Sequence, residues 1–147
     1  MYPRRLFLLL FTTFLASCAT DQGGFTGIVA PPAGQAVIYV YRTDLYLSHD
    51  PSLAPDVRIN NQNIGTLHRG GYFRVVMDAG PAVIALYARE NNEDTFWRAM
   101  STAVVNLELA PNSTHFVEFT LNRNQFSFAA KPADTAQRAL SQLRPLN

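Results

Sequence analysis

Alternation of apolar and polar residues recurs along the chain after residue 34 and predicts β-strands. In residues 95–109 the odd positions are mainly apolar and the even positions mainly polar. Residues 72–78 and 114–122 alternate in the same way, and residues 125–130 offer a shorter strand around two phenylalanines. A period of two places successive side chains on opposite faces of a strand. These segments therefore predict strands with one face toward a core.

Residues 35–42 form a short apolar stretch that does not alternate. Its central members are all β-branched or aromatic: Val37, Ile38, Tyr39, Val40 and Tyr41. A strand that is apolar on both faces is typically central in its sheet and covered on each side. We therefore expect this strand in the middle of the fold.

Turn-forming residues separate the predicted strands. Residues 56–60 and 63–67 flank Asn61 and Gln62, which predicts a hairpin with its tight turn at this pair. The Ala-Gly-Pro sequence at residues 79–81 indicates another turn before the next strand.

Helical periodicity is confined to the C-terminal end. One stripe there is apolar: Ala136, Ala139, Leu140 and Leu143. Asp134, with Gln137 three residues later, predicts a capping box at the start of this helix, and Pro145 prevents its extension. Seven or eight short strands and one short C-terminal helix predict a mainly β protein. Its architecture would be an antiparallel β-sandwich-like domain or a curled open sheet.

The first 18 residues follow a different pattern. Arg4 and Arg5 provide a positive start, residues 6–14 are almost entirely apolar, and small residues precede Cys18. These three parts are typical of a secretory signal peptide, and the apolar part is too short to cross a bilayer as a permanent helix.

The ending Leu15-Ala16-Ser17-Cys18 resembles the lipobox of bacterial lipoproteins. The resemblance implies cleavage between Ser17 and Cys18 and acylation of Cys18, which would anchor the protein to a membrane. By analogy with enterobacterial sorting, Ala19 favours the outer membrane, with the domain facing the periplasm. The alternatives are an ordinary signal peptide with an incidental cysteine, a cytosolic core cysteine, or display on the cell surface.

Three regions follow from these patterns. Residues 1–17 are the expected lipoprotein signal peptide. Residues 18–34, rich in glycine and proline, are the expected lipidated flexible tether. Residues 35–147 are the expected single domain.

Composition narrows the possible partners. Without Arg4 and Arg5, ten of the 12 basic residues remain against 11 acidic ones. This near-neutral balance argues against a nucleic-acid partner, which requires a basic patch. Cys18 is the single cysteine, so no disulfide can form within the chain.

The order of several short motifs resembles a known family. The chain resembles the small bacterial lipoproteins of the domain of unknown function 2846 family in the order of its motifs. These motifs are residues 37–42, 57–60 and 64–67, followed by Tyr72-Phe73 and Asp78-Ala79-Gly80. The chain is similar, more distantly, to PEGA-type surface domains. Arg42, Gly65 and Gly80 fall on the shared pattern. The resemblance implies a β-rich domain anchored in the envelope, and it brings no catalytic residues.

Candidate reaction chemistry is sparse. Ser48-His49-Asp50 holds the three residue types of a hydrolase triad, but adjacent residues cannot converge in the required relay geometry. None of the three histidines are spaced three or four apart, and no second cysteine completes a metal-ligand set. We therefore expect no metal, no cofactor and no enzyme activity. The alternative is a small periplasmic hydrolase that uses His49 or His68.

The expected function is that of a binding or structural-interaction module of the cell envelope. Its partner would be another envelope protein or the cell-wall glycan, met through a strand edge or an aromatic patch. Arg42 is expected either to stack or pair as a structural arginine, or to belong to a ligand site.

Overall fold

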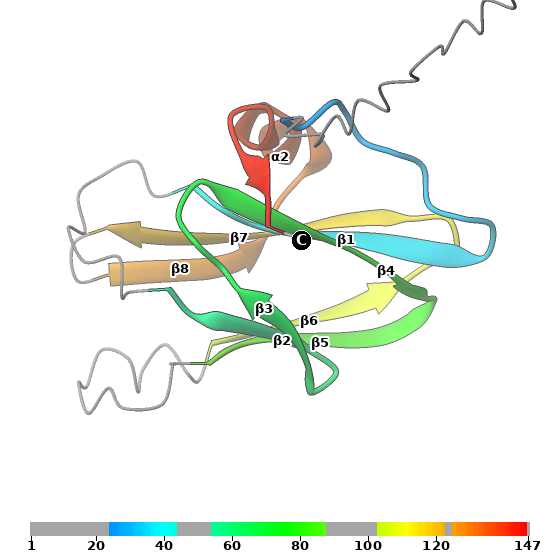
Figure 1. The fold of residues 1–147 in the computed structure, drawn as a ribbon. Helices are drawn as coiled ribbons and strands as arrows, with labels where there is room; N and C mark the ends of the chain where they lie inside the picture. The colour runs from blue at the N-terminus through cyan, green and yellow to red at the C-terminus, as the bar shows by residue number, and fades with distance from the viewer. Residues whose placement is uncertain (1–23, 44–53, 88–102, 123–124, 147) are drawn as a thin grey trace, which may run out of the picture.

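The computed structural model describes residues 24–43, 54–87, 103–122 and 125–146 (Figure 1). Most of these residues lie in strands. The elements are β1 (Gln35–Arg42), β2 (Asp56–Ile59), β3 (Gln62–Thr66), β4 (Gly71–Asp78), β5 (Gly80–Tyr87), β6 (Val104–Leu109), β7 (Thr114–Asn122), β8 (Gln125–Ala130), α2 (Ala133–Leu140) and β9 (Arg144–Pro145).

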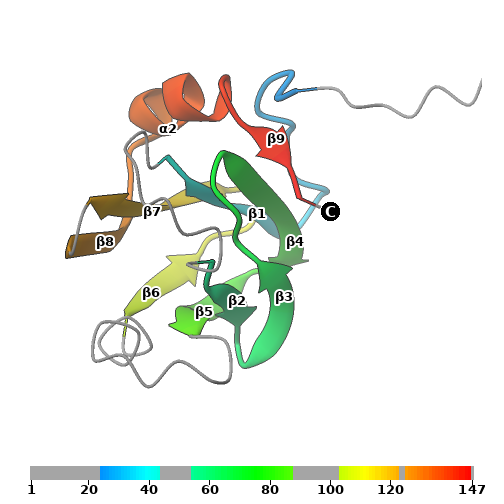
Figure 2. The ribbon, with the colours of Figure 1, turned by 60° about the vertical axis from the view of Figure 1, so that its left-hand side comes forward.

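The strands form two sheets that face each other (Figure 2). Sheet A has the order β8-β7-β1-β4-β9, and sheet B has the order β3-β2-β5-β6. Helix α2 covers the outer face of sheet A, so the described part of the chain has three layers (Figure 1). The predicted class, a mainly β sandwich-like domain with a short C-terminal helix, is confirmed.

Two strand pairs differ from the antiparallel pattern. β1 pairs in parallel with β7, and β4 pairs in parallel with β9. A parallel pair requires a long crossover connection, and between β1 and β7 the chain passes through the whole of sheet B. The sandwich is therefore mixed in sheet A and antiparallel in sheet B.

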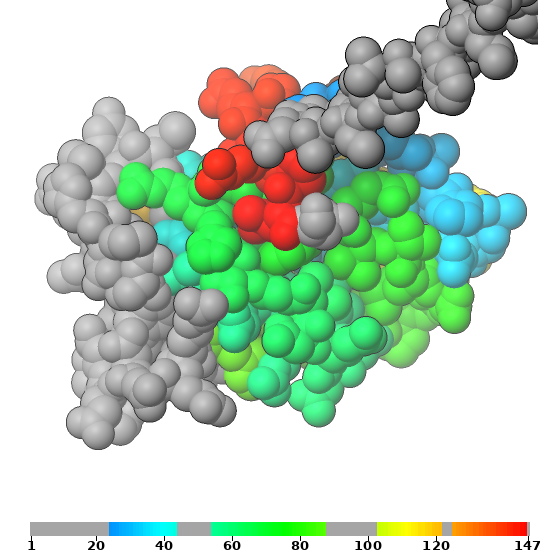
Figure 3. Space-filling model, viewed as in Figure 1, coloured from blue at the N-terminus to red at the C-terminus, as the bar shows by residue number. Residues whose placement is uncertain are grey.

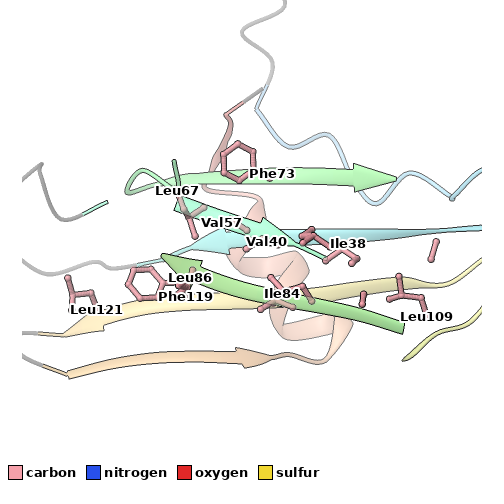
Figure 4. Packing of buried hydrophobic residues seen from close by; sticks show 14 residues of the cluster. Ile38, Val40, Val57, Leu67, Phe73, Ile84, Leu86, Leu109, Phe119 and Leu121 are labelled. Atoms are coloured by element: carbon pink, nitrogen blue, oxygen red, sulfur yellow. The ribbon is translucent and has the colours of Figure 1, made fainter. Parts of the chain in front are cut away.

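β1 has the central position that its apolar sequence predicts. Ala36, Ile38 and Val40 face sheet B in the inner core, which fills the space between the sheets (Figure 4). Tyr39 and Tyr41 point the other way, toward α2. Both faces of this strand are buried, so no polar alternation is required.

The inner core also receives the predicted apolar faces of the other strands. Phe73, Val75 and Met77 of β4 contribute, as do Val105, Leu107 and Leu109 of β6 and Val117, Phe119 and Leu121 of β7. The alternation predicted for these strands is confirmed. Residues 95–102, expected to begin the strand before β6, lie outside the described residues.

A second, outer core lies between sheet A and α2. Its buried members are Val37, Tyr39, Tyr41, Tyr72, Phe116, Ala136, Leu140 and Leu143. The rings of Tyr39 and Phe116 stack, with centroids 5.5 Å apart. The predicted helical stripe is thus buried, and its last member, Leu143, packs there from just beyond the end of the helix.

The predicted capping box is wrong. The helix begins at Ala133, its N-cap is Pro132, and no side chain makes a capping hydrogen bond. The extended backbone of Pro132 places its carbonyl to accept from the amide of Ala136 at 3.0 Å, which starts the helix one residue before Asp134. Asp134 therefore lies within the first turn, where its charge still complements the helix dipole.

The predicted hairpin exists, but its turn lies one residue earlier than Asn61–Gln62. Asn60 and Asn61 both have positive φ, 47° and 68°, which is the pattern of a type I′ turn. The side-chain amide of Asn60 accepts from the amide of Val83 at 2.8 Å and donates to the carbonyl of Pro81. These two hydrogen bonds to β5 fix Asn60 as the first residue of the turn, and β3 therefore begins at Gln62.

The segment predicted to be a flexible tether is attached to the domain from Phe25 onward. Phe25 meets Tyr39 and Tyr72 edge-on, with centroids 6.0 Å apart in both pairs. Ile28 also packs against the outer core. These apolar contacts keep the described part of the segment on the domain, so the packed structure begins before the predicted boundary at residue 35.

Candidate functional site

A pocket of about 630 Å³ opens beside α2, at the end of β1. Helix α2, the residues after it, β7 and the β3–β4 turn surround it. The described residues that line it are Arg42, Thr43, Arg69, Gly70, Glu118, Thr135, Arg138, Ala139, Gln142 and Leu143. This volume is in the range of small-molecule sites in proteins. Ala139 and Leu143 provide an apolar wall, and most of the remaining lining is polar.

Arg42 reaches the pocket from the last position of β1. Its side chain is buried, and Nη1 donates to the carbonyl of Leu67 at 3.2 Å. The guanidinium lies 5.2 Å from the ring centroid of Phe119, within the range of a cation–π contact. Arg42 is therefore a stacked structural arginine that also lines the pocket, and its membership of a ligand site stays a prediction.

Glu118 is the acidic residue of the pocket. It comes from the polar face of β7, and its two oxygens have different partners. Oε1 accepts from the Thr43 hydroxyl at 2.7 Å, and Oε2 lies 3.2 Å from Nζ of Lys131. Glu118 is therefore tied to Thr43 by a hydrogen bond and to Lys131 by an ion pair.

Arg69 and Arg138 lie at the exposed rim. Arg69 belongs to the β3–β4 turn, and Arg138 projects from the last turn of α2. Nε of Arg138 donates to the carbonyl of Asp134 at 3.3 Å, and no carboxylate of the described residues forms a salt bridge with it. The described lining of the pocket therefore holds three guanidinium groups and one carboxylate, and this carboxylate is paired with Lys131.

The Tyr41 hydroxyl is an unusual group next to this pocket. It is buried and has no hydrogen-bond partner among the described residues. Burial, and then the negative charge of Glu118, raise its pKa well above the ordinary value. The hydroxyl therefore stays protonated and neutral, and Tyr41 acts as a packing residue of the outer core.

The pocket residues other than Arg42 were not identified from the sequence. Arg69, Glu118 and Arg138 come from a turn, a strand and a helix that are distant in the chain. Each occupies a polar position of its own element, where a charged side chain is usually solvated. Only the tertiary structure brings these residues together. An example is the parallel pairing of β1 with β7, which places Glu118 opposite Tyr41 and next to Arg42.

Gly65 and Gly80, the other positions on the family pattern, have structural explanations. Gly65 lies at a bulge between β2 and β3 with φ of 145°, and an added Cβ would meet the Phe73 ring at 3.0 Å. Gly80 has φ of 132° where the chain passes from β4 in sheet A to β5 in sheet B. Both conformations favour glycine, and neither residue lines the pocket.

The residues of the predicted lipidation and cleavage site, Ser17 and Cys18, lie outside the described residues, and so does His49 with its neighbours Ser48 and Asp50. Within the described ranges, no helix is long and apolar enough to cross a membrane. No group of three metal-ligating side chains occurs there either.

A described hydroxyl contacts the ring of His115, which is not one of the histidines of the hydrolase alternative, His49 and His68. Ser113 Oγ lies 2.8 Å from Nε2 of His115. The same hydroxyl donates its hydrogen bond to the carbonyl of Ala110 at 2.6 Å, so it accepts a hydrogen bond from the ring rather than donating one. No carboxylate of the described residues orients this ring. His68 is exposed on the β3–β4 turn, and no described hydroxyl is bonded to it.

The aromatic residues that the structure describes do not form an exposed patch. Tyr39, Tyr41, Tyr72 and Phe73 are all buried. Tyr87 lies beneath the guanidinium of Arg58, at 4.1 Å from the ring centroid, on the outer face of sheet B. The pocket beside α2 is therefore the better candidate site.

No model of a known protein family matches this chain, and no curated protein matches it at a significant level. The resemblance to the domain of unknown function 2846 family and to PEGA-type domains stays a prediction.

Proposed function

We propose that the protein is a bacterial lipoprotein, anchored by lipid at Cys18, whose domain is a non-enzymatic binding module facing the periplasm from the outer membrane. The support for the anchor is the sequence of residues 1–18, with its positive start, apolar middle and lipobox-like end. The support for binding is the pocket beside α2.

The observation that carries the binding proposal is the charge of this pocket. Among the described residues, three arginines line it, and the one carboxylate in this lining is paired with Lys131. The planar guanidinium group matches carboxylate and phosphate oxygens with two parallel hydrogen bonds. The ligand class that fits is therefore an acidic group, carried by an envelope protein, a cell-wall glycan or a lipid.

Photo-crosslinking in the native envelope tests the binding site. A photoreactive amino acid replaces Gln142 on the pocket wall, and in a matched variant it replaces Asn63, which is exposed on β3 of sheet B. We expect an adduct from position 142, detected by mass spectrometry, and none from position 63. Equal crosslinking from both positions would contradict the pocket as the binding site.

The anchor is tested separately with a palmitate analogue supplied to growing cells. The protein with Cys18 should incorporate the analogue and sediment with membranes. Cys18→Ser should lose both properties because the thiol is the acylated group. Undiminished labelling and membrane retention of Cys18→Ser would rule out acylation at this position.

A further inference from the structure

The N-terminal segment leaves the domain on the same face as α2. Phe25 packs on Tyr39 and Tyr72 of the outer core, and Leu140 of α2 belongs to the same cluster. Figure 1 shows the start of the described chain (blue) beside α2, above sheet A. The connection toward Cys18 therefore starts from the α2 face and not from sheet B.

The length of this connection limits how far the domain can stand from a lipid at Cys18. Six residue steps separate Cys18 from Gly24. Even a fully extended chain spans at most ~3.6 Å per residue, so these steps reach only about 20 Å. A domain held by Phe25 therefore stays within about one domain radius of the bilayer surface.

The α2 side of the domain carries exposed arginine side chains that can meet that surface. Arg69 and Arg138 lie at the rim of the pocket, and the exposed Arg144 of β9 follows α2 in the chain. The C-terminal residues (red) lie at the surface next to the green strands (Figure 3). Arginine binds phosphate by paired hydrogen bonds and is attracted to anionic lipid surfaces.

We propose that the α2 face docks on the bilayer that carries the anchor, with phospholipid headgroup phosphates as the acidic groups received by the arginine-lined pocket. This inference rests on the proposed lipid anchor, since without it nothing brings this face to a membrane. The packing of Phe25 on the outer core fixes the orientation of the domain, so that the α2 face points toward the bilayer and sheet B faces away.

Energy transfer to a headgroup acceptor tests the orientation in the full-length lipidated protein. A donor dye is attached to Gln142→Cys on the α2 side, or to Asn61→Cys in the β2–β3 turn of sheet B. The protein is reconstituted in vesicles of phosphatidylcholine with phosphatidylglycerol that carry a headgroup acceptor. We expect higher transfer efficiency from position 142 than from position 61. Equal efficiencies, or the reverse order, would overturn the docking.

Two variants separate the contribution of the Phe25 packing from the contribution of the arginine charges. Phe25→Ala should reduce the difference between the two dye positions, because the segment then loses its ring contacts with Tyr39 and Tyr72 and keeps the packing of Ile28. Arg138→Gln should lower the transfer from position 142, and vesicles of phosphatidylcholine alone should lower it as well. Arg58→Gln removes a cation from the outer face of sheet B and should leave the transfer unchanged. An equal loss from Arg58→Gln would contradict the role assigned to the α2 face.

The two proposals fail in different ways. Mass spectrometry of the purified protein shows whether Cys18 carries lipid before any vesicle is made. Absence of the lipid overturns the anchor, and with it the docking. Lipid on Cys18 together with equal transfer from both dyes overturns the docking alone, and the pocket is then left to a soluble acidic ligand.

Discussion

At the scale of single residues, Arg42 shows how one side chain serves both the core and the candidate site. Its stem lies in the buried interior, and its guanidinium contacts Phe119 and the carbonyl of Leu67. A buried cation is retained when its hydrogen bonds compensate for lost hydration. Because these contacts already hold the Arg42 side chain in place, it presents its positive charge to the pocket in a fixed position. Binding of a ligand would therefore not cost the side-chain entropy that ordering a mobile surface arginine costs.

Replacing Arg42 should therefore cost folding stability. We expect Arg42→Ala to lower the free energy of unfolding by about 2–4 kcal/mol, through a cavity and an unpaired carbonyl at Leu67. Urea denaturation measures this change. The exposed Arg144 supplies the control, since Arg144→Ala should change stability by less than ~0.5 kcal/mol. Equal effects of the two substitutions would show that the Arg42 contacts contribute little.

His115 makes stability depend on pH. Burial lowers its pKa below the ordinary value of 6.5, so the folded protein binds this proton less readily than the unfolded chain. Between the lowered pKa and 6.5 the unfolded state binds more protons, and the free energy of unfolding falls as the pH falls.

The corresponding experiment compares the urea midpoint at about pH 7.5 and about pH 5. The protein with His115 should lose stability on acidification, and His115→Asn should lose less of it. A variant with the same pH dependence as the unmodified protein would show that His115 is not responsible.

At the scale of elements, the β2–β3 hairpin shows how a tertiary contact decides a turn. The local sequence Asn60-Asn61-Gln62 allows the turn at two neighbouring pairs. The bonds of Asn60 to Val83 and Pro81 on β5 select the earlier one. A shift of one residue would turn every side chain of β3 to the opposite face.

The position of this turn can be tested by a pair of glycine substitutions. Asn61→Gly should stabilise the protein by up to about 1 kcal/mol, because a type I′ turn favours glycine at its second position. Gln62→Gly should destabilise it by roughly 0.5–1 kcal/mol, because glycine weakens a strand. Thermal or urea unfolding measures both. Stabilisation by Gln62→Gly would place the turn at Asn61–Gln62 after all.

The sequence was sufficient to predict a strand or helix wherever the burial of its side chains determines the apolar pattern. β1 reads as an uninterrupted apolar stretch because one of its faces meets sheet B and the other meets α2. The β1–β7 pairing was not predictable, since the strands are separated by all of sheet B and a strand pattern does not encode its partner. The start of α2 was missed because Pro132, which has no capping side chain, takes the N-cap position and its carbonyl accepts the first helical hydrogen bond, from the amide of Ala136.

At the scale of the whole molecule, the pocket depends on that same pairing. Arg42, Glu118 and Arg138 come from β1, β7 and α2, and each looks like an ordinary polar position within its own element. The family resemblance pointed to Arg42 but to no other member of the lining. Sequence patterns therefore predicted the class of the fold, whereas the candidate site arises from contacts between distant elements.

The tethering of the whole domain is the claim on which the proposed function and the docking both depend. Its most direct measurement is mass spectrometry of the amino-terminal peptide from protein extracted from native membranes. The peptide should begin at Cys18 and carry the mass of a diacylglycerol thioether and an amide-linked acyl chain. A peptide that retains residues 1–17, or one that begins at an unmodified residue in protein recovered from the soluble fraction, would contradict the account.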